Sequence, residues 1–196
     1  MPIPRLTLER TALIVIDVQE RLLPTIVDSE RVVTNCTAAL ELAKVLGLPA
    51  IVTEQYVKGL GHSAPTLAAA AAGHAKTIEK TRFSAVIPAV EEFLSTNRCD
   101  DVLICGVEAH VCVQQTVLDL LAIGRQPFLL TDAISAGKLD QIAPAFRRME
   151  RAGAVPSGVL GAAYEILGDA AHPQFKAVLG VVKTLRAPFQ PSLPLP

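Results

Sequence analysis

Short, almost continuous apolar runs alternate along this chain with longer segments in which apolar residues recur every three or four positions. A continuous apolar run bounded by turn residues is typical of a strand buried on both faces, whereas the second pattern indicates an amphipathic helix. We predict strands at residues 11–17, 50–54, the start of 77–85, 100–106, 127–132 and 154–158. We predict helices at residues 29–47, within 65–73, and at 88–97, 110–123, 140–153, 160–168 and 172–186.

The order of these elements predicts the fold class. Strands that alternate with helices and are apolar along their length form a parallel sheet in a doubly wound α/β domain, with helices on both faces. No shift in composition divides residues 1–186, so we expect a single domain there. Residues 187–196 are rich in proline, and we expect an extended tail that is either mobile or lies on a neighbouring subunit. Ser29 is the expected N-cap of the first long helix, and Gly47 marks its end.

Composition narrows the class of protein. The chain has 196 residues, of which 51% are hydrophobic, and this fits one globular domain with a substantial core. A net charge of −1 without a run of Lys or Arg argues against a nucleic-acid partner. No signal-peptide core and no membrane-spanning stretch is visible, so we expect a cytoplasmic protein without a membrane partner. In that reducing compartment the four cysteines should be free thiols.

Three residues with reactive side chains follow predicted strands. Asp17 ends the first strand, Lys80 follows the third, and Cys112 follows the fourth. Ligands in doubly wound sheets bind beyond the carboxyl ends of the strands, and there these side chains converge. A thiol at a helix N-terminus beside an ammonium group has a lowered pKa, so we expect Cys112 to be ionised. Asp17 can accept and return a proton, and free backbone N–H groups can stabilise an oxyanion.

Each of these residues also has a purely structural interpretation. Asp17 can cap a loop, and Lys80 can be a solvated loop charge. Cys112 can be a buried core thiol, which is the place that we predict for Cys36 and Cys105. The alignment of an acid, an ammonium and a thiol at one edge of the sheet favours the functional interpretation.

Five stretches between about residue 10 and residue 168 resemble the isochorismatase-like cysteine hydrolases. The stretches are IDVQERLL, TEQYVKGLG, EKTRFSA, CGVEAHVCVQQTVLDLL and TDAIS followed by RRMERAGA. Within the family, the branch of isochorismatase domain-containing proteins is the most similar. The resemblance implies a Rossmann-like sheet of six parallel strands and a catalytic triad of Asp17, Lys80 and Cys112.

The resemblance also implies how the oxyanion is held. In relatives, the peptide bond that matches Val107–Glu108 is cis and turns backbone N–H groups toward the sulfur. The N–H groups of Glu108, Ala109 and Cys112 are therefore the expected oxyanion hole.

The chain departs from the zinc-binding relatives of this family. Nicotinamidases carry a D-x-H motif after the second strand, where this chain has Glu54, Gln55 and Tyr56. His62 lies in the following loop without a matching set of ligands. We therefore expect neither a metal nor another cofactor.

Four further residues are candidates for substrate binding. Gln19 lies near the predicted carboxylate and can support it, or it can instead satisfy backbone groups of the loop. Tyr56, Leu60 and Phe83 can line the pocket, or they can serve in packing.

The residues and the resemblance together predict a metal-independent cysteine hydrolase that cleaves an amide-type C–N bond in a small molecule through a thioester acyl-enzyme. One alternative is vinyl-ether hydrolysis of isochorismate with Asp17 as the acid. Another is a thiol-responsive binding protein without turnover. Some relatives carry a ribonuclease label, for which the charge of this chain offers no support. The hydrophobic composition and the Pro-rich tail favour a homo-oligomer.

Overall fold

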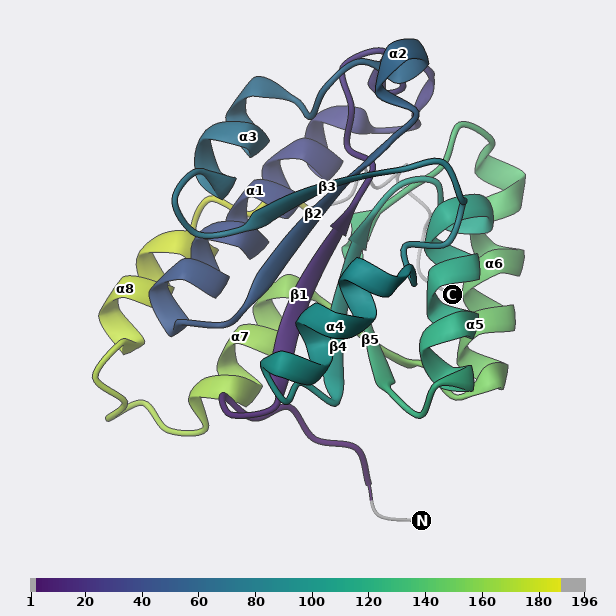
Figure 1. The fold of residues 1–196 in the computed structure, drawn as a ribbon. Coiled ribbons are helices and arrows are strands. Elements are labelled where there is room, and N and C mark those ends of the chain that lie inside the picture. Colours follow the sequence, from purple (N-terminus) through teal and green to yellow (C-terminus); the bar gives the residue numbers. More distant parts are fainter. Residues whose placement is uncertain (1–2, 188–196) are drawn as a thin grey trace, which may run out of the picture.

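The structure is a computed structural model that describes residues 3–187. The Pro-rich tail predicted at residues 187–196 lies outside this range except for Ala187. Within the range, six strands form one sheet with helices on both faces (Figure 1). The predicted doubly wound α/β fold is confirmed.

The sheet is parallel throughout. Its strands are β1 (Thr11–Ile16), β2 (Ala50–Gln55), β3 (Lys76–Lys80), β4 (Asp101–Gly106), β5 (Gln126–Ile134) and β6 (Val155–Ser157). They lie in the order β3-β2-β1-β4-β5-β6, so the chain builds outward from β1 on one side and then crosses back to add β4 on the other. Ligand sites in such sheets lie at the carboxyl ends of the strands where the order reverses, here β1 and β4.

The continuous apolar runs reflect a sheet that is covered on both faces. Every residue of β1 and of β4 is buried. Successive side chains of a strand point to opposite faces, so Leu13 and Val15 belong to one hydrophobic core and Ile14 and Ile16 to the other. Both positions of the strand period must therefore be apolar, and this requirement makes the strands readable from sequence.

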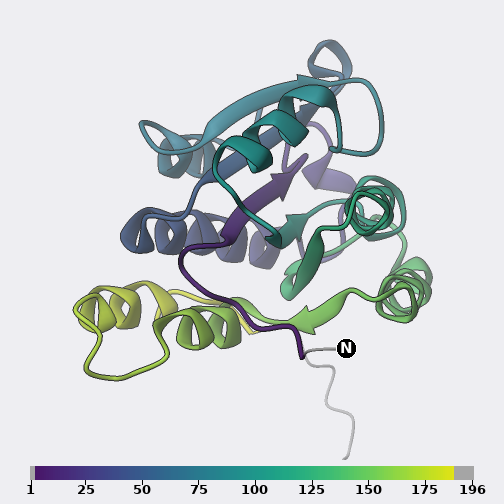
Figure 2. The same cartoon turned by 60° about the horizontal axis from the view of Figure 1, so that its bottom comes forward.

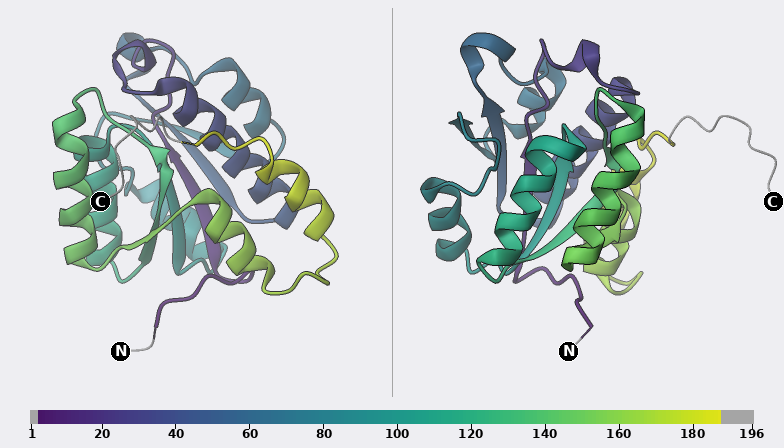
Figure 3. Two further views of the ribbon diagram at one scale, coloured as in Figure 1. Left: turned by 180° about the vertical axis from the view of Figure 1, so that it is seen from behind. Right: turned by 90° about the vertical axis from the view of Figure 1, so that its right-hand side faces the viewer.

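Two helical layers enclose the sheet. Helices α1 (Ser29–Leu46), α3 (Pro65–Ala71), α7 (Val159–Leu167) and α8 (Phe175–Val182) contribute to the core on one face. Helices α4 (Pro88–Thr96), α5 (Gln114–Ala122) and α6 (Leu139–Ala152) contribute to the core on the other. Figure 2 and Figure 3 show the two layers from below, from behind and from the side. None of the helices within residues 3–187 combines the length and the apolar character that crossing a bilayer requires.

Three short helical elements lie in the connections. These are the 3-10 turn η1 (Leu23–Thr25), the short helix α2 (Val57–Leu60) and the π-helical turn η2 (Ala109–Val113). The sequence predicted one uninterrupted helix at residues 110–123, but η2 replaces its first turn before α5 begins. Single π turns of this kind occur frequently at functional sites.

The predicted ends of the first long helix are partly confirmed. Asp28, with a left-handed φ of 53°, is the N-cap in place of Ser29, which is already the first helical residue. The Asp28 carboxylate does not bond to the helix backbone and instead accepts a hydrogen bond of 2.7 Å from Nε of Arg31. Gly47 ends the helix as predicted, with a φ of 72° that glycine adopts without steric cost.

Candidate active site

The structure brings Asp17 and Lys80 into direct contact at the carboxyl edge of the sheet. Asp17 follows β1 directly with a φ of 54°, and Lys80 is the last residue of β3. Nζ of Lys80 lies 2.7 Å from Oδ2 of Asp17, and neither side chain is exposed to solvent. The interpretation of Lys80 as a solvated loop charge is therefore wrong.

Thr53 and Gln55 of β2 support this ion pair from the strand between the two residues. The hydroxyl of Thr53 donates to Oδ1 of Asp17 at 2.7 Å, while Oε1 of Gln55 accepts from Nζ of Lys80 at 2.7 Å. Sequence analysis did not single out Thr53, and it noted Gln55 only as a departure from a zinc motif. The available signal was their spacing of two residues at the end of a strand, which places both on one face of the sheet.

The ammonium group of Lys80 also binds the loop that follows β3. It donates to the backbone carbonyl groups of Arg82 at 3.2 Å and of Phe83 at 3.0 Å. A buried ammonium is tolerated only when acceptors surround it, and Lys80 has four. The lysine therefore connects the acidic residue with the loop at residues 81–87.

Cys112 lies in η2, after β4, and shares this site. Its side chain and the Asp17 carboxylate are close enough to affect each other's ionisation. Burial and the negative charge of Asp17 raise the pKa of the Cys112 thiol to about 12, against the opposing effect of the Lys80 charge. The prediction that the sulfur is ionised in the free protein is therefore wrong. The prediction from sequence considered the ammonium group and the helix terminus, which lower the pKa of the thiol. It did not consider burial and the Asp17 carboxylate, which raise it.

The pKa of Asp17 is also raised. Burial raises the pKa of its carboxyl group above the ordinary value of 3.8, although Lys80 and the hydrogen bonds to the carboxylate oppose the shift. A carboxylate with a raised pKa is a stronger base than one in water. The site thus holds a neutral thiol beside a basic carboxylate, and the ammonium of Lys80 balances the negative charge.

The backbone around Glu108 accounts for only part of the expected oxyanion hole. The Val107–Glu108 peptide is cis, as the resemblance implied. The N–H of Ala109 donates to the carbonyl of Ser135 at 2.8 Å, so Ala109 is not a free donor and its assignment is corrected. The N–H of Glu108 has no acceptor among residues 3–187. Glu108 and Cys112 stay the predicted donors.

The side chain of Gln19 bonds to backbone groups at the end of β2 and in the loop that follows it. Its Nε2 donates to the carbonyls of Gln55 and Gly61 at 3.0 and 2.6 Å, and its Oε1 accepts from the Gln55 N–H at 2.7 Å. The side chain is fully buried. Of the two interpretations made from sequence, support of the Asp17 carboxylate and satisfaction of loop backbone groups, these hydrogen bonds match the second, and a contact of Gln19 with substrate stays a prediction.

Glu54, at the end of β2, bonds to the loop that follows it. Oε1 of Glu54 accepts from the N–H and the hydroxyl of Ser63 at 2.6 and 2.7 Å, and Nδ1 of His62 lies 3.0 Å from its Oε2. Within residues 3–187, no three His, Cys, Asp or Glu side chains gather in a way that could hold a metal ion. Glu54 and His62 therefore hold the loop at residues 56–64, and the absence of a cofactor stays a prediction.

Of the three predicted pocket residues, Tyr56 and Phe83 contact Lys80 at the end of β3 through their backbone. Tyr56 and Phe83 are more than half exposed, at 57% and 53%, and Leu60 is partly buried. A cavity of about 590 Å³ is lined by Tyr56, Lys80 and Arg82, among others, but by neither Leu60 nor Phe83. Substrate contacts for all three stay predictions.

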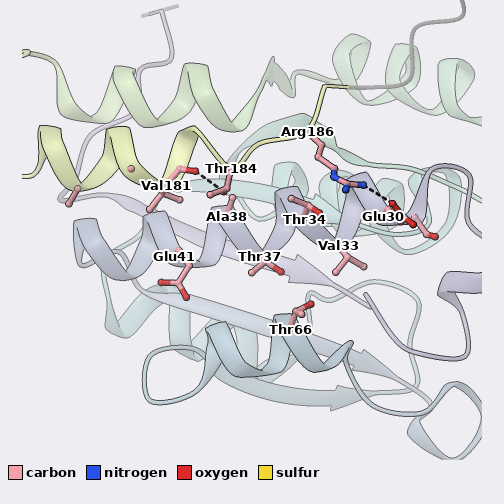
Figure 4. A pocket seen from close by; sticks show the side chains of 13 residues that line it. Glu30, Val33, Thr34, Thr37, Ala38, Glu41, Thr66, Val181, Thr184 and Arg186 are labelled. Carbon is pink, nitrogen blue, oxygen red and sulfur yellow. Dashed lines mark hydrogen bonds and ion pairs between the residues drawn. The ribbon is translucent and has the colours of Figure 1, made fainter.

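A larger cavity of about 890 Å³ lies away from this chemistry. It is a groove between α1, α3 and α8, lined by small and hydroxyl-bearing residues such as Thr34, Thr37 and Thr184 (Figure 4). An ion pair between Glu30 and Arg186 lies at one end of it. None of the predicted site residues lines this groove.

Comparison with known proteins identifies the family. The family model described as Isochorismatase domain matches residues 11–159. The chain is 34% identical over 175 residues to isochorismatase domain-containing protein 2 of Rattus norvegicus, covering 89% of this chain and 82% of that protein. It is 33% identical over 183 residues to the secreted isochorismatase effector Isc1 of Phytophthora sojae, covering 91% and 87% of the two chains.

Two solved structures show the same architecture. MAR1 ribonuclease from Caenorhabditis elegans superposes with a TM-score of 0.91 at 36% identity, over 98% of this chain and 99% of that one. The YcaC gene product of Escherichia coli, described as an octameric hydrolase of unknown specificity, superposes with a TM-score of 0.81 at 25% identity, over 95% and 100%. The sheet order, the site at its carboxyl edge and these likenesses agree. The chain therefore belongs to the isochorismatase-like hydrolase family.

Proposed function

We propose that this protein is a metal-independent cysteine hydrolase that cleaves an amide-type C–N bond of a small molecule. Cys112 is the proposed nucleophile, Asp17 the proton carrier, and Lys80 the group that holds Asp17 in its basic form. The observation that supports this most directly is the fully buried Asp17–Lys80 pair, with its 2.7 Å contact, beside the thiol of Cys112 in η2. Such a pair is costly to bury, so a chemical use accounts for it better than a structural one.

The proposed first half-reaction begins from the neutral thiol. As the sulfur of Cys112 forms a bond to the substrate carbonyl carbon, its proton passes to the carboxylate of Asp17. The carbonyl oxygen becomes an oxyanion, for which the free N–H of Glu108 is a candidate donor. The C–N bond then breaks, Asp17 returns the proton to the leaving nitrogen, and a thioester to Cys112 remains.

The proposed second half-reaction releases the acid. Asp17, again a carboxylate, accepts a proton from water as the water oxygen attacks the thioester carbonyl. The C–S bond breaks and the proton returns to the sulfur, which restores the neutral thiol. Lys80 transfers no proton in this scheme and acts through the four hydrogen bonds that its amino group donates.

A panel of small amides, ureides and carbamates tests the proposal through release of ammonia. We expect turnover of at least one compound, loss of turnover in Cys112→Ala and Asp17→Asn, and a substrate-derived mass on the Cys112 peptide after rapid quenching. EDTA should leave the rate unchanged. Cys99→Ser, which alters a buried thiol on a different loop, is the matched control and should retain activity. Silence of the folded wild-type protein across the panel would contradict the proposal.

Vinyl-ether hydrolysis of isochorismate is the second candidate. The raised pKa of Asp17 favours it, because a carboxyl group with a raised pKa keeps its proton to a higher pH than an ordinary aspartate does. This reaction needs no thiol. Turnover of isochorismate by Cys112→Ser at the wild-type rate, with loss in Asp17→Asn, would support this candidate over the amide reaction.

The thiol-responsive binding protein is less well supported. Oxidation follows thiolate character and exposure, whereas Cys112 is only 7% exposed and burial raises its thiol pKa to about 12. Reversible oxidation of Cys112 by dilute peroxide, with no turnover of any amide, would establish it nevertheless.

The proposed partners are a small-molecule substrate and further copies of this chain. The E. coli relative is described as octameric, which supports a homo-oligomer. Although one relative is named a ribonuclease, a net charge of −1 supports no nucleic-acid partner, and retention of RNA on a filter at low salt would contradict this. Four free and buried cysteines support a reducing, cytoplasmic location, although one relative is named a secreted effector.

A further inference from the structure

We propose that Thr116 is a positioning residue that ties the Cys112 backbone to the loop held by Lys80, and so sets where the sulfur lies relative to Asp17. This inference rests on the proposed function, in which Cys112 is the nucleophile. Neither the sequence analysis nor the family resemblance singled out Thr116.

The Thr116 hydroxyl makes two hydrogen bonds to different segments. It donates to the carbonyl of Cys112 at 2.6 Å and accepts from the N–H of Ala85 at 2.8 Å. The residue is fully buried near the start of α5. A hydroxyl has one proton and two lone pairs, so it can make both bonds at once, which neither a methyl nor a carbonyl can do.

The loop at the other end of this contact is the one that Lys80 binds. Nζ of Lys80 donates to the carbonyls of Arg82 and Phe83, only two or three residues before Ala85. The same ammonium donates to Asp17. A continuous path of hydrogen bonds and one short stretch of backbone therefore joins the carboxylate, the ammonium, the loop and the cysteine.

The local structure around Cys112 explains why such a tie is needed. The N–H of Val113 bonds to the carbonyl of Glu108, five residues back, as in a π turn. Because η2 has this wider hydrogen-bond spacing in place of the α-helical one, the geometry of α5 does not by itself extend to Cys112. The hydroxyl of Thr116 bonds one turn back to the Cys112 carbonyl, directly where η2 passes into α5.

Thr116→Val and Thr116→Ala both remove the hydroxyl, and whichever of them folds provides the test. We expect kcat for the amide substrate to fall about 10- to 100-fold with little change in KM, because a small displacement of the nucleophile is costly to the chemical step. We also expect the pH profile of Cys112 alkylation to move toward that of an ordinary thiol, since the sulfur moves away from Asp17. Thr116→Ser should retain the wild-type kcat within about threefold, because serine keeps both hydrogen bonds.

Thr11→Val is the matched control. Thr11 is also fully buried, and its hydroxyl also donates to a carbonyl four residues back, that of Thr7 at 2.6 Å, but it lies at the opposite end of β1. The Thr11→Val protein should be less stable than the wild type but should keep its kcat and its alkylation profile.

A folded Thr116→Val or Thr116→Ala protein with wild-type kcat and alkylation profile would overturn the inference, and so would Thr116→Ser behaving like Thr116→Val. A different result, the absence of amide turnover in the wild-type protein, would contradict the proposed function. If the wild-type protein turns over no amide, the alkylation profile still tests whether Thr116 positions Cys112.

Discussion

Asp17 and Lys80 form an ion pair with no exposure of either side chain. Removing two charges from water costs about as much as their attraction returns, so such a pair adds little net stability, although breaking it is expensive. Variants that remove one charge or both can therefore distinguish what the pair contributes to stability from what it contributes to turnover.

Lys80→Met should destabilise the protein by about 3–5 kcal/mol, because it leaves the Asp17 carboxylate buried without a cation. Adding Asp17→Asn should recover about 2 kcal/mol or more, since the remaining groups are neutral, while turnover stays abolished. Unfolding in urea measures both effects. Strictly additive losses in the double variant would show that the two side chains do not interact.

The second prediction at this scale concerns the ionisation of Cys112. Alkylation by iodoacetamide should be slow near neutral pH and should accelerate as pH rises toward about 12, the pKa to which burial and Asp17 raise the thiol. Asp17→Asn removes a negative charge beside the sulfur, so it should lower the thiol pKa and speed alkylation near pH 8, although turnover is lost. Peptide mass spectrometry after timed labelling measures the rates. Fast alkylation of wild-type Cys112 at neutral pH would contradict the raised pKa and support the ionised sulfur that was predicted from sequence.

The same shifts predict how turnover depends on pH. The carboxylate form of Asp17 is the base, and its pKa is raised above 3.8. Turnover should therefore fall as pH decreases through this raised pKa, because the protonated carboxyl group cannot accept the thiol proton. The acidic limb of kcat/KM should lie above the position that an ordinary aspartate would give.

At the scale of elements, the end of β4 must approach β1 closely to place η2 beside Asp17. Gly106 ends β4 with a φ of 112°, and a Cβ there would lie 2.0 Å from the carbonyl oxygen of Ile16. No residue with a side chain fits without separating the two strands. The glycine is therefore part of how the fold delivers Cys112 to the site.

Gly106→Ala should cost about 3 kcal/mol or more, from backbone strain and from the displacement of β4. Gly47→Ala is the control, because Gly47 has a similarly positive φ of 72° but open space around its missing Cβ. Its cost should be only about 1–2 kcal/mol. Thermal unfolding of both variants compares them. Equal losses would show that strand contact at Gly106 is unimportant.

At the scale of the whole molecule, the predicted homo-oligomer is directly measurable. The chain has a mass of 20.8 kDa, so light scattering coupled to size exclusion should give a multiple of this value. Apolar side chains stay uncovered on one chain, both in the groove between α1, α3 and α8, at Val33, Ala38 and Val181, and at the exposed Tyr56 and Phe83. A mass of a single chain at micromolar concentration would contradict the prediction.

The elements and the place of the site followed from sequence because they depend on local patterns. An apolar run bounded by turn residues, such as that of β1, is typical of a strand covered on both faces, and strands that alternate with helices typically form a parallel sheet. Parallel strands end at the same edge of the sheet. For this reason Asp17, Lys80 and Cys112 could be predicted to converge although they are far apart along the chain.

Only the tertiary structure decided the chemical state of that site and the neighbours that complete it. The Cys112 pKa depends on burial and on a carboxylate from another strand, so a rule based on the helix terminus gave the wrong direction. The N–H of Ala109 donates to the carbonyl of Ser135, and the hydroxyl of Thr116 accepts from the N–H of Ala85. Both hydrogen bonds join segments that are about 30 residues apart along the chain. Periodicity along a chain determines which face a residue occupies, whereas hydrogen bonds and ionisation depend on distances in space that the packed fold alone establishes.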